Sequence, residues 1–194
     1  MVSRPPLLLA SSSPYKRALL QRLGIPFSAE RPDIDEARRR DEPPLVMARR
    51  LAGEKTDALA TDFPNAAILG GDQVIALDDQ IFSKPKTSRR AVEQLTALQG
   101  KTHELICAIC LRMPDGSKHW AHSIYQMVMR PLDTDQIEAY VDDDSPLDCA
   151  GSYRIEAAGI RLFEATHGDD PTAIEGLPLT KVWSLLLSQG WQHD

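Results

Sequence analysis

Three hydroxyl residues and a lysine follow the first apolar run of the chain. The run Leu7–Ala10 is typical of a buried strand, and Pro14 with the apolar spacing after it predicts a helix that begins at once. Ser13 is placed to cap that helix, so free backbone N–H groups and the positive end of the helix dipole would lie above the strand. With Lys16 in the first turn, this arrangement suits a phosphate, and an ordinary capped helix with solvated charges is the alternative.

An aspartate stands in a second apolar run. Residues 67–77 predict a buried strand that Gly70, Gly71, Asp72 and Gln73 interrupt. Burying an unpaired carboxylate is costly, and the two glycines let backbone or ligand come close. Asp72 is therefore expected to be a general base or a metal ligand at a strand end, with an ordinary turn aspartate as the alternative.

Four more charged residues stand near small or apolar segments: Glu36, Lys55, Lys84 and Glu156. Each alone is best interpreted as a solvated charge. Their significance depends on being brought together with Asp72.

The elements that must position these residues alternate between helix and strand. Apolar spacing predicts helices over residues 43–62, 88–99, 134–141 and 178–188, with Ser88 as the cap of the second. Residues 102–113 and 118–130 predict a hairpin. The pattern favours an α/β domain with a mixed sheet.

Composition narrows the class of protein. The 194 residues are 42% hydrophobic and carry a net charge of -6, which argues for a globular chain and against nucleic-acid binding. No apolar run is long enough for a membrane span or a secretory signal, so a cytoplasmic protein is expected. Three cysteines argue against a disulfide framework, and Cys107 and Cys110 would point to opposite faces of a strand, which excludes a shared zinc or redox site.

Seven segments in order carry a resemblance to a known family: LASSSP, IDE, RLAGEK, GGDQ, KP, LDCAGS and GLPL. From about Leu7 to Gly190 the chain resembles the Maf family of nucleoside triphosphate pyrophosphatases, and more narrowly its YceF-like subgroup. The resemblance implies one domain over residues 1–194 with an α/β fold. That fold has a mixed twisted sheet with flanking helices and two lobes around a deep cleft, and is similar to the inosine-triphosphatase-like (Maf/Ham1) fold.

The resemblance also implies an active site. Asp72 matches the proton acceptor, and a divalent cation, Mg²⁺ or Mn²⁺, would be held by phosphate oxygens together with Glu36 and Asp72. Lys16 stands where the family usually has arginine, which keeps the charge but loses the bidentate fork. The residues that match the phosphate-binding positions are Ser11, Ser13, Lys16, Lys55 and Lys84.

Three positions set specificity in the family, and here they are Tyr15, Gln73 and Glu156. This combination resembles the subgroup associated with 7-methyl-GTP. A cationic purine attracts an aromatic face, and a carboxylate accepts hydrogen bonds from the guanine edge. The expected reaction converts the triphosphate to monophosphate and pyrophosphate. A dTTP/UTP pyrophosphatase, a non-catalytic nucleotide-binding regulator of septum formation and a phosphosugar-binding protein are the alternatives. The resemblance is also compatible with a homodimer.

Overall fold

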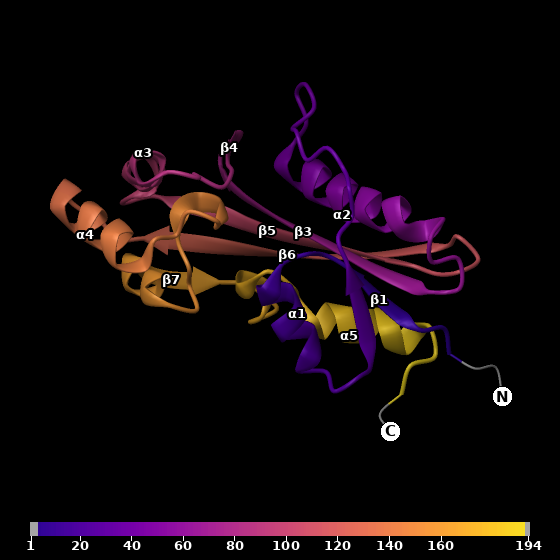
Figure 1. Cartoon of the computed structure of the whole chain (residues 1–194). Coiled ribbons are helices and arrows are strands. Elements are labelled where there is room, and N and C mark those ends of the chain that lie inside the picture. The colour runs from indigo at the N-terminus through magenta and orange to yellow at the C-terminus, as the bar shows by residue number, and fades with distance from the viewer. Residues whose placement is uncertain (1–3, 193–194) are drawn as a thin grey trace. The chain divides into compact units, whose positions relative to one another are not determined.

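A computed structural model of the chain describes residues 4–192, which divide into two compact units (Figure 1). Unit 1 holds residues 4–72, 107–123 and 170–192, and unit 2 holds residues 73–106 and 124–169. The chain passes between the units within three long strands, which are β3 (Ala67–Leu77), β5 (Thr102–Arg112) and β6 (Lys118–Met129).

The remaining elements lie within one unit each. Those of unit 1 are β1 (Leu7–Ala10), α1 (Pro14–Gln21), β2 (Phe27–Glu30), α2 (Pro44–Ala60), the short 3-10 helix η3 (Ala173–Glu175) and α5 (Leu179–Ser188). Those of unit 2 are β4 (Gln80–Phe82), α3 (Ser88–Leu98), α4 (Thr134–Asp144), the short 3-10 helices η1 (Ala150–Ser152) and η2 (Ala158–Leu162), and β7 (Phe163–His167).

The described strands form one seven-stranded sheet in the order β2-β1-β3-β5-β6-β7, with β4 paired to β3. β1 runs parallel to β2 and β3, whereas β3–β4 and β6–β7 are antiparallel pairs. The predicted α/β fold with a mixed sheet is confirmed. Parallel pairing of β1 on both sides explains why all four of its residues are buried.

Alternate residues of β1 face two different helical layers of unit 1. Leu7 and Leu9 belong to a core cluster with leucines of α1 and α5, whereas Leu8 packs in a second cluster with Leu59 of α2. Figure 1 shows the same separation, with α2 on one face of the sheet and α1 and α5 on the other. The loop between β1 and α1 therefore follows a strand that is fixed from both faces.

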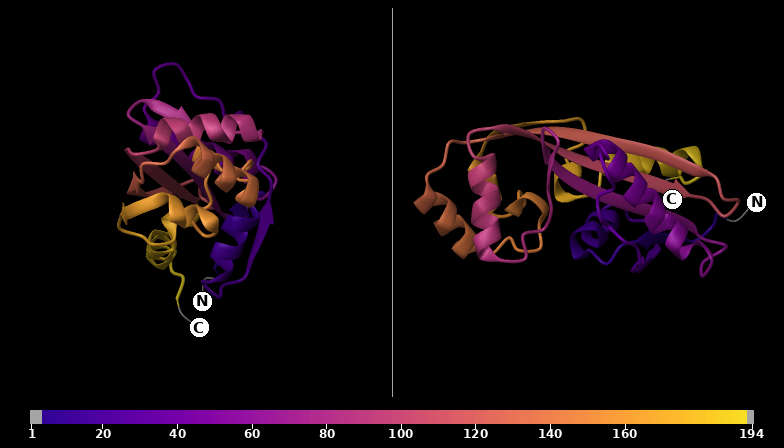
Figure 2. Two further views of the ribbon diagram at one scale, coloured as in Figure 1. Left: turned by 90° about the vertical axis from the view of Figure 1, so that its left-hand side faces the viewer. Right: turned by 90° about the horizontal axis from the view of Figure 1, so that it is seen from above.

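Unit 2 has its own core. α3 lies beside α4, as both views in Figure 2 show. The rings of His103, Tyr153 and Phe163 pack against one another, and Tyr153 and Phe163 meet edge to face with their centroids 4.9 Å apart. Of the helices in residues 4–192, none combines the length and the apolar character that crossing a bilayer requires.

Three predictions about the elements need correction, and three short strands were not predicted. β3 is continuous over 11 residues through the Gly-Gly-Asp segment, with Ala67–Gly70 paired to β1 and Ile75–Leu77 paired to β4. The cap of α3 is Thr87, whose hydroxyl accepts from the Arg90 amide, and not Ser88. α4 continues three residues past Val141. The short strands β2, β4 and β7 lack the long apolar runs by which the other strands are found.

Candidate active site

A buried carboxylate stands in the middle of β3. Asp72 is only 8% exposed, and its Oδ1 accepts a hydrogen bond from Nζ of Lys55 at 2.5 Å. Lys55 projects from the buried face of α2, and the same Nζ lies 2.8 Å from Oε1 of Glu36. Glu36 is mostly exposed, on the loop before α2. The structure thus joins three predicted site residues from three separate segments through one ammonium group.

Gly70, two residues before Asp72, explains how α2 comes close enough for this contact. A Cβ at Gly70 would lie 2.2 Å from the carbonyl oxygen of Ala52 and 2.8 Å from Cγ2 of Thr56. Only a residue without a side chain lets the helix backbone approach the strand so closely. Gly71 faces a different neighbour, since a Cβ there would lie 3.3 Å from Leu177.

The N-terminus of α1 has the geometry that the sequence predicts. Ser13 is the N-cap, and its Oγ accepts from the Lys16 amide at 3.4 Å. The Ser13 amide donates to Oγ of Ser11 at 3.1 Å. The side chains of Tyr15 and Lys16 are half-buried in the first turn. The helix dipole adds a positive field at this end, and the Lys16 charge acts on Asp72.

The electrostatics of the site follow from burial. Burial raises the pKa of Asp72 above its usual value, and the cations of Lys55 and Lys16 oppose this rise without cancelling it. Burial disfavours the ammonium of Lys55, but Asp72 and Glu36 outweigh it, and the pKa of Lys55 is raised. Lys55 is therefore a cation around neutral pH, and Asp72 binds a proton more readily than an exposed aspartate does.

The other predicted site residues belong to unit 2. Gln73 directly follows Asp72 in β3 and is half-buried. Lys84 is exposed just after β4. Glu156 is exposed in a turn before η2, where the amides of Ala157 and Gly159 both donate to the Arg154 carbonyl. These three residues stay predictions as members of the same site.

Asp170 is a buried carboxylate that sequence reasoning did not single out. It is fully buried, and both oxygens accept hydrogen bonds at the start of α5, from Thr172 and from Thr180. Its pKa is held below the usual value by these donors, despite burial. The contacts fix the segment that places Leu177 against Gly71. The only signal for it was an aspartate before a proline, which is also typical of an ordinary turn.

The three cysteines are free. Burial raises the pKa of Cys107 to about 12 and that of Cys110 to about 11, so both stay thiols at neutral pH. Cys110 faces Thr56 of α2, with 3.9 Å between Sγ and Oγ1. Within residues 4–192, His, Cys, Asp and Glu side chains do not gather in groups of three or more that could hold a metal.

The family model described as "Maf-like protein" matches residues 6–189, which is nearly the whole chain. The chain belongs to the Maf family. Among curated Maf relatives, a protein of Pseudomonas savastanoi pv. phaseolicola named 7-methyl-GTP pyrophosphatase is 44% identical over 96% of this chain and 97% of its own. Proteins of the same name from Xanthomonas axonopodis pv. citri and Pseudomonas aeruginosa are 44% and 41% identical, with 97% and 96% of this chain covered and 98% and 97% of theirs.

Solved structures place the Maf chain among proteins of the Ham1 fold. The Ham1 protein of Staphylococcus aureus aligns over 95% of this chain and 99% of its own with a TM-score of 0.55 at 14% identity. A HAM1 protein from Coxiella burnetii aligns over 95% and 100% with a TM-score of 0.53 at 16% identity. At such identities the likeness concerns the fold alone, and it confirms the predicted fold class.

Proposed function

We propose that the chain is a nucleoside triphosphate pyrophosphatase that hydrolyses 7-methyl-GTP between its α- and β-phosphates. The oxygen of a water molecule bonds to the α-phosphorus, the bond from that phosphorus to the α,β-bridging oxygen breaks, and pyrophosphate leaves. The observation that carries this proposal is the buried Asp72 held by Lys55, in a family whose full-length relatives bear that activity as their name.

Asp72 is the general base of this reaction. Its raised pKa makes it a better proton acceptor than an exposed aspartate, and it takes the proton that the attacking water loses. Lys55 holds the accepting carboxylate in one orientation through its contact with Oδ1. Both groups come from buried positions on rigid elements, so little motion is needed before reaction.

Positive charge for the triphosphate comes from the start of α1. The dipole at the Ser13 cap and the ammonium of Lys16 offset the charge that develops on the leaving pyrophosphate. Ser11 contributes a hydroxyl to the same segment. Lys84 adds a cation from unit 2 in this proposal, as the family resemblance implies.

The residues also fit a divalent cation. Glu36 and Asp72 present carboxylate oxygens to one point, the Nζ of Lys55, and Mg²⁺ commonly binds through one or two carboxylates plus substrate phosphates. We propose that these two residues hold Mg²⁺ or Mn²⁺ when substrate binds. The ion would polarise phosphoryl oxygens and offset their charge.

Specificity is proposed to depend on Tyr15, Gln73 and Glu156. The Tyr15 ring would attract the positive charge of an N7-methylated purine, by roughly 0.5–2 kcal/mol. Glu156 would accept hydrogen bonds from the guanine N1–H and amino group. The relatives' printed name supports this base preference.

A panel of triphosphates tests the proposal. The chain is incubated with 7-methyl-GTP, GTP, dTTP or UTP and with Mg²⁺ or Mn²⁺, and released pyrophosphate is measured. We expect the highest kcat/KM for 7-methyl-GTP, and a loss of that preference in Glu156→Gln. Glu164→Gln, which changes another exposed glutamate of unit 2, is the matched control. Preference for dTTP or UTP would contradict the base assignment, and nucleotide binding without pyrophosphate release would favour a regulator.

A further inference from the structure

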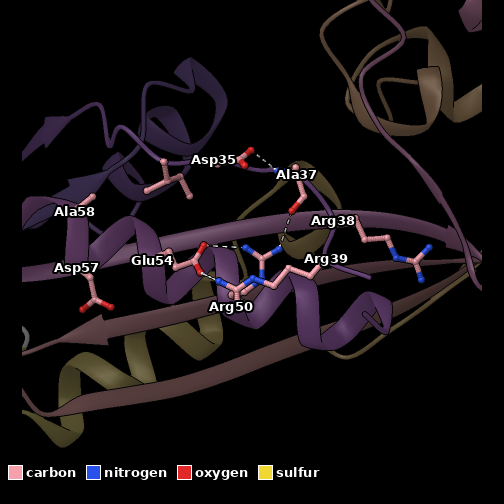
Figure 3. Close-up of a pocket in the computed structure, with 9 residues that line it drawn as sticks. Asp35, Ala37, Arg38, Arg39, Arg50, Glu54, Asp57 and Ala58 are labelled. Atoms are coloured by element: carbon pink, nitrogen blue, oxygen red, sulfur yellow. Dashed lines mark hydrogen bonds and ion pairs between the residues drawn. The ribbon is translucent and has the colours of Figure 1, made fainter. Parts of the chain in front are cut away.

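The loop that carries Glu36 is exposed over residues 35–41. It lies over the exposed side of α2 and leaves a pocket of about 640 Å³ beneath it. Figure 3 shows this pocket, lined on the loop side by residues such as Asp35 and Arg38 and on the helix side by Arg50 and Glu54. Polar contacts join the loop to this helix.

Arg50 makes most of these contacts from α2. Its Nε and Nη2 donate to the two carboxylate oxygens of Glu42 at 2.6 and 2.8 Å. Nη2 also donates to the carbonyl of Ala37 at 3.0 Å, one residue beyond Glu36. Nη1 donates to Glu54 at 2.8 Å, which fixes the guanidinium on its own helix. The Arg50 side chain thus links two points of the loop, Ala37 and Glu42, to α2, and Figure 3 shows its contacts with Ala37 and Glu54.

Glu42 completes the arrangement from the loop. Its side chain is 5% exposed, and besides Arg50 it accepts from the Arg39 amide at 3.0 Å. Its backbone carbonyl accepts from Nε of Arg38 at 2.9 Å. The loop is therefore folded around the Glu42 carboxylate, and Arg50 joins that carboxylate to the helix that bears Lys55.

We propose that Arg50 and Glu42 are positioning residues that hold Glu36 beside Lys55 and Asp72. This inference depends on the proposed function only for its effect on catalysis. A bidentate guanidinium–carboxylate pair has a defined geometry, which an ammonium cannot reproduce.

The Arg50–Glu42 pair is charged around neutral pH. Hydrogen bonds from Arg50 lower the pKa of Glu42 to about 2, although burial opposes this. The ion pair is therefore fully formed at pH values above the usual carboxyl pKa, and it is lost as the pH falls toward 2.

Arg50→Lys tests the effect on catalysis, because lysine keeps the positive charge but cannot form the bidentate contact with Glu42. We expect kcat/KM to fall roughly ten- to a hundredfold, with a higher metal concentration needed for half-maximal rate. In a Glu36→Gln background, Arg50→Lys should lower kcat/KM by less than threefold, because the carboxylate that Arg50 positions is already absent. Arg22→Lys is the matched control, because Arg22, the C-cap of α1, forms a bidentate pair with Glu175 of η3 and not with this loop.

Amide hydrogen exchange tests the same inference without any turnover. In Arg50→Lys and Glu42→Gln, the amides of residues 37–42 should exchange faster, whereas Arg22→Lys should leave them unchanged. Unaltered exchange in both variants, or full additivity of Arg50→Lys with Glu36→Gln, would overturn the inference. A wild-type chain that releases no pyrophosphate would contradict the proposed function, and hydrogen exchange would still decide whether Arg50 fixes the loop.

Discussion

Two buried carboxylates of unit 1 have pKa values shifted in opposite directions. Glu42 receives two hydrogen bonds from one guanidinium and another from a backbone amide, and together these exceed the cost of burial. Asp72 receives one hydrogen bond from Lys55, and burial outweighs it. The first carboxylate is therefore held permanently as an anion, which suits a structural anchor. The second keeps an affinity for protons, which suits a general base.

Asp72→Asn should separate activity from stability. The amide cannot take a proton from water, so we expect kcat to fall at least about a hundredfold. Folding raises the pKa of Asp72, so at pH values above the usual aspartate pKa the ionisation of this residue destabilises the folded chain. This destabilisation is absent from the variant. The same substitution removes a charged partner of the buried Lys55 ammonium, which destabilises the folded chain. Because the two effects on stability oppose each other, the melting temperature at pH 7 should change little while kcat falls.

Calorimetry and pyrophosphate release measure the two effects on the same sample. Asp78→Asn is the matched control, because Asp78 is exposed in the turn after the same strand and its left-handed backbone tolerates asparagine. A variant Asp72→Asn that keeps wild-type turnover would exclude Asp72 as the base.

At the scale of the element, β3 is where sequence reasoning failed in an informative way. Gly-Gly-Asp is typical of a turn, so a break in the strand was predicted. In the structure the strand continues, and Gly70 serves the close approach of α2. Chain-local signals could not show this, since the helix backbone that needs the space lies 18 residues earlier. The capped helix α1, by contrast, depends on neighbouring residues alone and was predicted correctly.

Gly70→Ala should therefore destabilise the chain strongly. The new methyl group would meet the backbone of Ala52 at 2.2 Å, and backbone cannot rotate away, so α2 must move. We expect a loss of about 2 kcal/mol or more in the free energy of unfolding. In denaturant titrations, Gly71→Ala should cost less, because its methyl group would meet the flexible end of Leu177 at 3.3 Å. Equal stabilities of the two variants would contradict this account of α2 packing.

At the scale of the whole molecule, the sequence was sufficient to predict the main helices and strands and the residues that act within one segment. It predicted the mixed sheet and singled out Asp72, because buried runs, caps and a charged exception to an apolar pattern are visible locally. Lys55 and Glu36 were assigned to the site by the family resemblance alone. The sequence did not predict the contacts that hold the site residues in position, such as the Arg50–Glu42 pair. Charged residues in a loop and on a helix resemble solvated charges until their partner is known.

The core of unit 2 gives the molecule a dependence on pH. His103 is 2% exposed, its Nε2 lies 3.1 Å from the Tyr153 hydroxyl, and burial lowers its pKa to about 4. The unfolded chain binds a proton at this histidine below about pH 6.5, whereas the folded chain does not. The free energy of unfolding should therefore fall by up to about 3 kcal/mol as the pH drops from 6.5 to 4.

In His103→Gln, melting temperatures measured across this range should decline less steeply than in the wild type, whereas the exposed-residue control His122→Gln should follow the wild type. An unchanged slope in His103→Gln would show that other groups govern the acid sensitivity.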